Sequence, residues 1–194
     1  MKDIFTGKLV RLSAFDPEEM SKAMPRWNRN SEYFRLLNSS GQPIQSSKAA
    51  LKWMEKDVAE ISPGSYFFSI RALADDMLLG ELELDVVNWS AGDSFVGLGI
   101  GEAEHWGKGY GTDVMKVLLR FAFAEVNLRR VTLSVFEYNP RAIRSYEKAG
   151  FRHEGRARKV LNKEGKRWDV LFMGILREEW MQQTNQVTGA ANGP

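Results

Sequence analysis

The sequence predicts a single domain of the mixed α+β class with about seven strands. Two observations support this. The 194 residues are 43% hydrophobic and 27% charged, as expected for a globular chain that builds one sizeable core. Stretches with apolar residues at every second position also alternate with stretches that follow the 3.6-residue period of a helix. The predicted domain covers residues 1–181, and residues 182–194 contain too few apolar residues to pack, which predicts a disordered tail.

The N-terminal part of the chain predicts a strand followed by helices. Residues 9–15 are predicted to form the strand, and a helix begins at Asp16, an N-cap residue with Pro17 at the first helical position. Residues 26–45 mix aromatic residues, arginines and turn formers, and they predict a short helix and a loop. Three aromatic residues in this segment either line a binding cleft or pack in the core: Trp27, Tyr33 and Phe34.

An amphipathic helix is predicted from Ser46 or Ser47 to a turn at Pro63-Gly64. Its apolar stripe consists of Leu51, Met54, Val58 and Ile61. Strands at 66–73 and 78–88 follow, joined by a turn at 74–76. One face of the second strand carries three carboxylates: Glu81, Glu83 and Asp85. Such a row is either a solvated sheet face or a surface that meets a cationic substrate.

The next strand, within residues 94–102, has glycine at alternate positions. One face carries Val96, Leu98 and Ile100. The other face carries only Gly97, Gly99 and Gly101. Because glycine weakens a strand, three glycines at this spacing indicate that something approaches the backbone closely.

This strand leads into a turn at 105–112 with the sequence H-W-G-K-G-Y-G-T. Three glycines in five residues let backbone N–H groups converge, and a helix predicted over 112–125 begins behind them. Convergent N–H groups at a helix N-terminus bind anions, most often phosphate, although a glycine-rich turn without a ligand has the same sequence. A ligand with an extended arm along the bare strand and a phosphate end in the turn would use both features. Coenzyme A has that shape.

A second motif, N-P-R-A-I-R-S-Y-E-K-A-G-F at 139–151, follows a strand predicted at 131–137. It has an N-cap at Asn139, a proline at the first helical position and a glycine after the last. Tyr146 lies on the inward face, where it is either a core tyrosine or a functional group. Two last strands complete the predicted sheet: 151–161 and 168–176.

Composition and spacing exclude several classes of protein. The 27 Lys and Arg against 25 Asp and Glu lack the basic excess of a nucleic-acid-binding protein. The chain has no cysteine and two isolated histidines, so neither disulfides nor a metal cluster is expected. No apolar run approaches the length of a membrane span and the N-terminus lacks a signal-peptide core, which predicts a cytoplasmic protein without membrane contact. The G-x-G-x-G of 107–111 fits neither a P-loop nor the dinucleotide fingerprint.

The two motifs, in this order, resemble the GNAT superfamily of acyl-CoA-dependent N-acyltransferases. The likeness is strongest to its ribosomal-protein N-terminal and diamine acetyltransferases, and it covers roughly residues 8–180. It implies a central, mostly antiparallel twisted sheet of about seven strands flanked by about four helices. The family's loop, Q/R-x-x-G-x-G/A, falls on Trp106, Gly109 and Gly111, so Trp106 replaces the usual Gln or Arg. This branch often has an aromatic residue there, because main-chain N–H groups hold the pyrophosphate.

The resemblance implies that acetyl-CoA is the acyl donor and that no metal takes part. It makes Asn139 a coenzyme contact and Tyr146 the general acid. Together with the chemistry of acyl transfer, which favours N–H donors near the end of the bare strand, it places these residues at the coenzyme: Ile100, Gly101, Glu102, Trp106, Gly107, Lys108, Gly109, Tyr110, Gly111, Thr112, Asn139 and Tyr146.

The implied reaction is direct transfer of an acetyl group to a primary amine, on a protein N-terminus or a small molecule. A tyrosine with a pKa of about 10 is protonated at neutral pH and able to donate to a thiolate of pKa about 8.5. An amine with a lysine-like pKa near 10.4 needs a base, whereas an α-amino group of pKa about 8 needs little help. The candidate bases are Glu83 and Glu102.

Two further expectations concern activity and assembly. Because no residue is clearly marked as the base, a coenzyme-binding or interaction module without transferase activity is the alternative function. The edge formed by the last predicted strands is compatible with a homodimer.

Overall fold

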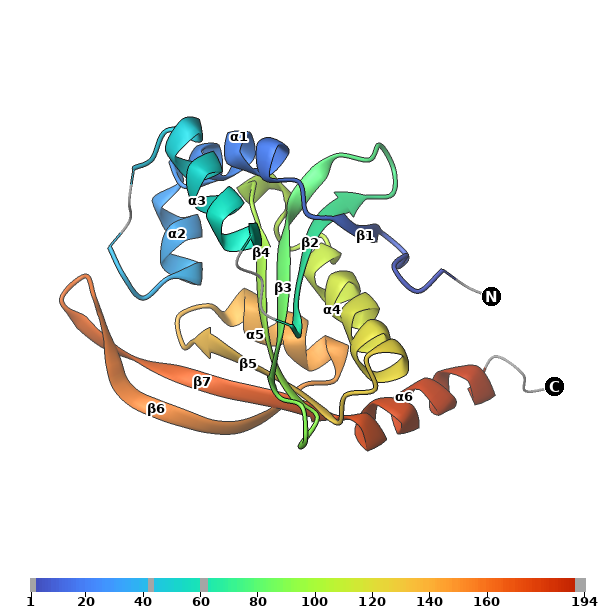
Figure 1. Ribbon diagram of the computed structural model, residues 1–194. Coiled ribbons are helices and arrows are strands. Elements are labelled where there is room, and N and C mark those ends of the chain that lie inside the picture. Colours follow the sequence, from blue (N-terminus) through green and yellow to red (C-terminus); the bar gives the residue numbers. More distant parts are fainter. Residues whose placement is uncertain (1–2, 42–43, 60–62, 191–194) are drawn as a thin grey trace.

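The computed structural model describes residues 3–41, 44–59 and 63–190. A seven-stranded sheet runs through the molecule in the order β1-β2-β3-β4-β5-β7-β6, and all neighbouring strands are antiparallel except β4 and β5 (Figure 1). The strands are β1 Val10–Ala14, β2 Ser65–Ala72, β3 Leu78–Asn88, β4 Asp93–Ile100, β5 Arg130–Phe136, β6 Arg152–Lys163 and β7 Lys166–Leu176. The predicted α+β class with a mostly antiparallel sheet is confirmed.

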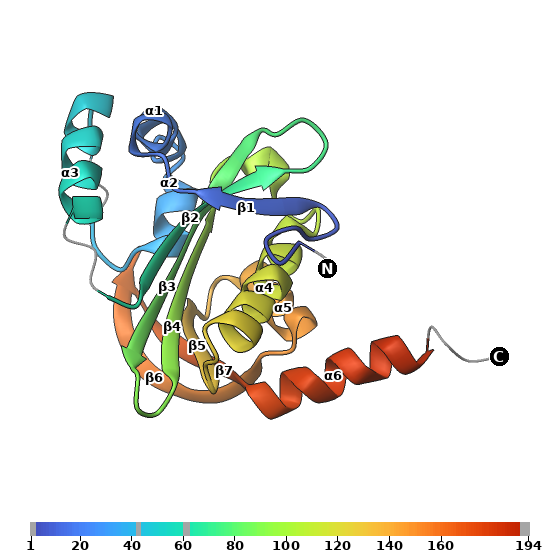
Figure 2. The ribbon, with the colours of Figure 1, turned by 45° about the vertical axis from the view of Figure 1, so that its right-hand side comes forward.

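Helices cover both faces of the sheet. The described residues form six α-helices rather than about four: α1 Pro17–Trp27, α2 Ser31–Leu37, α3 Ser47–Ala59, α4 Tyr110–Arg120, α5 Pro140–Ala149 and α6 Arg177–Ala190. Helices α1, α2 and α3 lie on one face and α4 and α5 on the other (Figure 2). Each side has its own apolar core, a large one between the sheet, α4 and α5 and a small one among α1, α2 and α3. None of the helices described is long and apolar enough to cross a bilayer.

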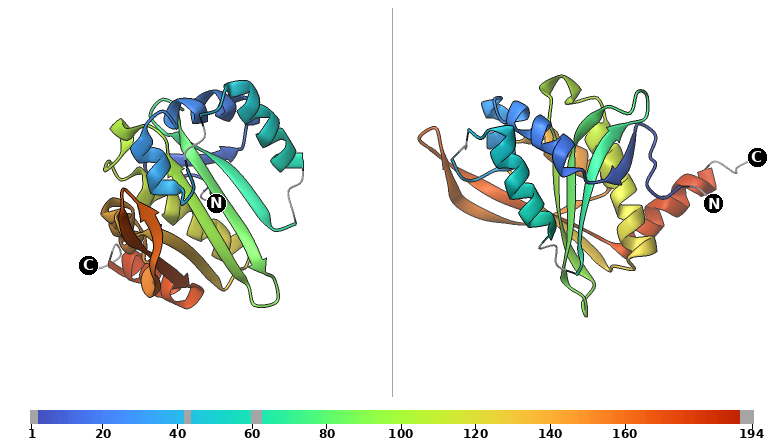
Figure 3. Two further views of the ribbon diagram at one scale, coloured as in Figure 1. Left: turned by 90° about the vertical axis from the view of Figure 1, so that its left-hand side faces the viewer. Right: turned by 45° about the horizontal axis from the view of Figure 1, so that its top comes forward.

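The sheet opens between β4 and β5. These two strands pair only at their first three positions, Asp93–Phe95 with Arg130–Thr132, although β4 continues to Ile100 and β5 to Phe136. The strands therefore diverge and leave part of the backbone edge of β4 without a neighbouring strand. The β6–β7 hairpin extends beyond the sheet toward α2 (Figure 3), where Arg35 of α2 forms an ion pair with Glu164 in the hairpin turn.

Helix α4 is fixed to the N-terminal segment by a buried carboxylate. Asp113 accepts hydrogen bonds from the backbone N–H groups of Lys8, Leu9 and Val10 at 2.8, 2.7 and 3.1 Å. Three charge-assisted bonds to one carboxylate oxygen balance the cost of burying it. The helix predicted over 112–125 begins two residues earlier and turns into a π-helix over Phe121–Glu125, so the predicted single continuous helix is corrected there.

The C-terminal segment differs most from the sequence-based expectation. Residues 182–190, part of the segment predicted to be a disordered tail, continue helix α6. The helix is held at its start, where Trp180 packs against the main core with its ring 5.5 Å from that of Phe123 and Glu179 accepts the Leu176 N–H. Residues 191–194, and Ile61 of the predicted stripe on α3, lie outside the described residues.

Candidate active site

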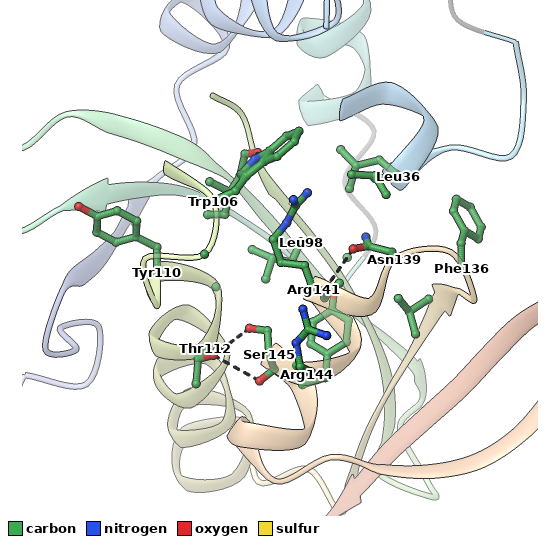
Figure 4. Close-up of a pocket in the computed structure, with 18 of the residues that line it drawn as sticks. Leu36, Leu98, Trp106, Tyr110, Thr112, Phe136, Asn139, Arg141, Arg144 and Ser145 are labelled. Carbon is green, nitrogen blue, oxygen red and sulfur yellow. Dashed lines mark hydrogen bonds between the residues drawn. The ribbon is translucent and has the colours of Figure 1, made fainter. Parts of the chain in front are cut away.

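A cavity of about 440 Å³ occupies the opening between β4 and β5 (Figure 4). It is bordered by β4, β5, α2, α5 and the loop that enters α4. Nine of the residues predicted at the coenzyme line it: Ile100, Trp106, Gly107, Gly109, Tyr110, Gly111, Thr112, Asn139 and Tyr146. The structure thus brings the two sequence motifs together across one cavity. Gly101, Glu102 and Lys108 are not among the lining residues.

The loop before α4 presents the start of the helix to this cavity. Gly107 and Gly109 have φ angles of +75° and +91°, which other residues adopt at a cost. Gly109 is the N-cap residue and no side chain caps the first N–H groups of α4, so these donors and the positive end of the helix dipole are available to an anion. The Trp106 indole N–H donates to the Ile100 carbonyl oxygen at 2.7 Å and fixes the loop against β4.

Helices α4 and α5 contact each other closely beside the cavity. The hydroxyls of Thr112 and Ser145 are 2.9 Å apart, and a Cβ on Gly111 would lie 3.3 Å from the Ser145 Oγ. Asn139 has two roles in the site. It lines the cavity, and its side-chain oxygen caps α5 by accepting a hydrogen bond from the Ala142 N–H at 3.1 Å. The predicted N-cap is confirmed.

Sequence reasoning missed a basic face of α5. Arg141, Arg144 and Lys148 line the cavity, and their spacing of three and four residues places them on one side of the helix. The Arg141 guanidinium also stacks 4.1 Å from the centre of the Trp106 ring. The sequence shows this face as basic residues at positions i, i+3 and i+7 after Asn139. Their positive charge adds to that of the N–H groups at the start of α4.

Tyr146 lies on α5 at the inner wall of the cavity and is 9% exposed. Burial raises the pKa of its hydroxyl to about 12, because the phenolate is poorly solvated there. Tyr146 is therefore protonated over the whole neutral range and retains a proton to donate.

The backbone of β4 corrects the prediction of N–H donors from Ile100 to Glu102. The Gly101 N–H donates to the Leu79 carbonyl oxygen at 2.8 Å and so belongs to the β3–β4 ladder. Alternate residues of a strand direct their N–H groups to opposite edges. The Ile100 N–H consequently faces the open edge beside the cavity.

The bare glycine face also has a different neighbour from the one predicted. A Cβ on Gly101 would lie 2.1 Å from the Trp27 indole, and one on Gly99 would lie 3.0 Å from the Tyr33 hydroxyl. Both aromatic side chains come from the helices opposite α4 and α5 and are nearly fully buried. The glycines thus admit α1 and α2, and the idea of a ligand arm along this whole face is wrong. Gly97 differs, since a Cβ there would meet no described atom within 4 Å.

A second cavity, of about 290 Å³, lies on this face under α1 and α3. Glu81 and Glu83 line it, whereas Glu102 pairs with Arg26 at 2.7 Å and lines neither cavity. Burial, followed by the nearby charge of Glu83, raises the pKa of Glu81 to about 7. Sequence reasoning noted Glu81 on the acidic face but did not select it, because its burial depends on α1, α2 and α3. Among the described residues there is no group of three or more acidic or histidine side chains arranged to hold a metal.

Comparison with known proteins adds three kinds of likeness. A family model for the acetyltransferase (GNAT) domain matches residues 10–152. An uncharacterized N-acetyltransferase derived from the SPbeta prophage of Bacillus subtilis is 27% identical over 176 residues, covering 91% of this chain and 94% of that protein. A probable N-acetyltransferase of Bacillus subtilis is 33% identical over 115 residues, covering 59% of this chain and 63% of that protein.

Two solved structures share the fold. Spermidine N-acetyltransferase from Vibrio cholerae, in complex with CoA and spermine, has a TM-score of 0.76 at 23% identity and covers 89% of this chain and 98% of its own. A GNAT-family acetyltransferase from Bacillus anthracis has a TM-score of 0.74 at 18% identity, covering 90% and 98%.

Proposed function

The chain belongs to the GNAT acetyltransferase family, and we propose that it transfers an acetyl group from acetyl-CoA to a primary amine. One observation carries the proposal: the uncapped N-terminus of α4 and the buried Tyr146 line the same cavity, where β4 and β5 diverge. The Vibrio cholerae enzyme with the same fold was solved with CoA and spermine, which supports a coenzyme donor and an amine acceptor.

The residues of this chain fit the parts of the donor. The N–H groups of the loop from Gly107 to Thr112 suit the pyrophosphate, because they converge at a helix N-terminus. Arg144 and Lys148 on α5 suit additional phosphate charge. Along the open edge of β4, the backbone N–H of Ile100 and the backbone groups of every second residue before it point away from β3. They can form hydrogen bonds with an extended arm of the donor that contains amide groups.

Acyl transfer requires a proton donor on the coenzyme side. It forms a C–N bond and breaks a C–S bond, so that the thiolate gains a proton and the amine nitrogen loses one. Tyr146 is the donor that the cavity provides, and its raised pKa keeps the proton available. The Ile100 N–H is placed to stabilise negative charge on the carbonyl oxygen, an effect of roughly 3–4 kcal/mol for such donors.

The two carboxylates predicted as candidate bases, Glu83 and Glu102, lie in different parts of the structure. Glu83 lines the second cavity and keeps that role as a proposal. The ion pair of Glu102 with Arg26 joins the end of β4 to α1, and we assign Glu102 to holding the helix against the sheet.

The experiment that tests this function follows free thiol release with acetyl-CoA and a panel of amines and peptides. Wild-type protein is expected to release thiol with at least one acceptor, and Tyr146→Phe to lower kcat by about 10²-fold or more with little change in CoA affinity. Tight CoA binding without release for any acceptor would favour the non-catalytic module. Thermal stabilisation by ATP and NAD but not by CoA would overturn the donor assignment.

A further inference from the structure

The two cavities meet at the middle of β4. They share three lining residues, Leu37, Gly97 and Leu98. Gly97 is the position where the bare glycine face is uncovered, because Gly99 and Gly101 are occupied by Tyr33 and Trp27. The missing side chain of Gly97 therefore opens a passage from the second cavity to the coenzyme cavity.

Two polar groups converge beside this passage. The space that a Cβ would occupy on Gly99 is 3.0 Å from the Tyr33 hydroxyl and 3.7 Å from the Cγ of Glu81. The Tyr33 side chain is 3% exposed, and its buried hydroxyl has no hydrogen-bond partner among the described residues. A buried hydroxyl without a partner destabilises the fold, and a ligand that forms a hydrogen bond with it removes that cost. The hydroxyl and the carboxylate thus form a site for a group that donates hydrogen bonds.

The remaining wall of the second cavity is apolar. It consists mainly of Phe15, Met24, Trp53, Met54 and Phe67, with Asn38 as the one neutral polar side chain and no lysine or arginine among the described lining residues. Trp53 is 51% exposed, so it forms the outer rim of the cavity. An apolar pocket with a few convergent polar groups at one end suits a ligand with one charged head and an apolar body.

We propose that the second cavity is the acceptor site and that its substrate class is a compact primary amine on an apolar or aromatic body. The amine nitrogen binds beside Glu81 in the second cavity and reaches the thioester past Gly97, where Tyr33, which lines the coenzyme cavity, can accept a hydrogen bond from it. This inference rests on the proposed acetyltransferase function and specifies its acceptor. The volume of about 290 Å³ lies near the lower end for small-molecule sites, which limits the body to a small one.

The lining disfavours the two other acceptor classes. A polyamine carries further cations along its length, and beyond Glu81 and Glu83 the described lining offers them no other carboxylate, only Asn38 and apolar side chains. A peptide N-terminus brings amide groups that need partners when buried, and Asn38 is the single neutral polar side chain available.

The reaction needs a base that removes a proton from the ammonium group of the acceptor, and we assign this role to Glu81. The Glu81 carboxylate takes one proton from the ammonium and later returns it to water. The freed lone pair forms the C–N bond as the C–S bond breaks, the thiolate takes the Tyr146 proton, and the second proton that the nitrogen loses as the amide forms restores Tyr146 through solvent. The groups that face Glu81 are Glu83 on its own strand and Tyr33 on α2, while Arg71 on β2 pairs with Glu19 of α1 farther along the same face. The raised pKa of Glu81 is consistent with holding a proton near neutral pH.

The test combines an acceptor panel with a blocked passage. The panel consists of 2-phenylethylamine, spermidine and an alanine-terminated tripeptide, each assayed by thiol release with acetyl-CoA. Wild-type kcat/KM is expected to be at least about tenfold higher for 2-phenylethylamine than for the others. Higher values for spermidine or the peptide would overturn the acceptor class while leaving the acetyltransferase function intact. No release with any acceptor would contradict the proposed function itself.

Gly97→Val is chosen to block the passage, because a Cβ at this strand position meets no described atom within 4 Å and leaves room for a branched side chain to begin. It is expected to lower kcat/KM for 2-phenylethylamine by about tenfold or more, and to lower CoA affinity, measured by calorimetry, by a smaller factor because Gly97 also borders the coenzyme cavity. Gly155→Val on β6, where a Cβ also meets nothing, is the matched control and is expected to behave as wild type. An unchanged kcat/KM for Gly97→Val overturns the passage.

Tyr33→Phe distinguishes a role of the Tyr33 hydroxyl in acceptor binding from a purely structural role. If the hydroxyl serves only the fold, its removal leaves KM unchanged and does not lower stability, because a buried group without a partner is removed. Our proposal expects KM for 2-phenylethylamine to rise about fivefold or more. An unchanged KM overturns the assignment of Tyr33.

Discussion

The proposed donor half and the proposed acceptor half of the site are built from different parts of the chain. The donor half consists of backbone N–H groups and helix termini, placed by glycines at 107, 109 and 111 and by the helix that follows. The acceptor half consists of side chains from α1, α2, α3, β2 and β3 that meet over the uncovered part of β4. Backbone sites recognise a chemical group shared by every member of a family, whereas side chains tune one chain to one acceptor.

Replacing the acceptor-side base is expected to have the largest effect. Glu81→Gln removes the proton acceptor, and kcat for an amine is expected to fall by about 10²–10⁴-fold while CoA affinity stays unchanged. Wild-type kcat should rise with pH through an inflection near 7, where Glu81 ionises, and the variant should lack it. Steady-state kinetics from pH 5.5 to 9 measure both. Asp85→Asn is the control, because Asp85 lies on the same face but accepts from Ser65 at 2.6 Å outside the cavity. A persisting inflection in the variant contradicts the assignment.

Glu81 is also expected to destabilise the folded state at high pH, where its carboxylate is ionised. The pKa of Glu81 is raised from 4.5 to about 7, so the folded state holds a proton that the unfolded state has lost, and stability falls as pH rises between these values. The loss at pH 8 is on the order of 3 kcal/mol. Glu81→Gln should therefore be more stable than wild type by that order at pH 8 and nearly equal at pH 4.5, measured by urea unfolding.

A matched variant checks this linkage. Glu55→Gln, at an exposed position on α3, should give no such gain at pH 8. A stability difference for Glu81→Gln that does not change between pH 4.5 and pH 8 would show that Glu81 ionises normally in the fold.

On the donor side, the expected effect is smaller because backbone contacts are many. Gly109→Ala places a Cβ at φ +91°, a strain of about 1–2 kcal/mol that the loop relieves by shifting the N–H groups of α4. CoA affinity is expected to fall about tenfold with KM for the amine unchanged, measured by calorimetry and kinetics. Gly155→Ala lacks the positive φ and should bind CoA as wild type. Equal effects on CoA and amine would contradict the separation of the two halves.

The contact between α4 and α5 should give the smallest effect. Thr112→Val removes the hydroxyl that lies 2.9 Å from the Ser145 hydroxyl and should cost about 1 kcal/mol of stability in urea unfolding. CoA affinity should change less than in Gly109→Ala. A double-mutant cycle with Ser145→Ala isolates the pair, and additive losses would show that the hydroxyls do not interact.

The sequence predicted most of the fold and both motifs that border the proposed coenzyme cavity. Strand and helix periods, the caps at Asp16 and Asn139, and the glycine turn depend on residues close together in the chain. Tyr146 was predicted to point inward from its place in a ten-residue helix, and it lines the cavity. These features are local, because main-chain conformation and helix faces are set by neighbouring residues.

Only the tertiary structure decided the acceptor half. The glycines of β4 were interpreted as a bed for the coenzyme, but Trp27 and Tyr33 fill two of the three positions and leave Gly97 open. Glu81 and Glu83 are both half-buried and line the same cavity, because α1 and α3 cover this face of the sheet. The burial of these carboxylates and the exposure of Gly97 depend on segments that are distant in sequence, so no local pattern predicts them.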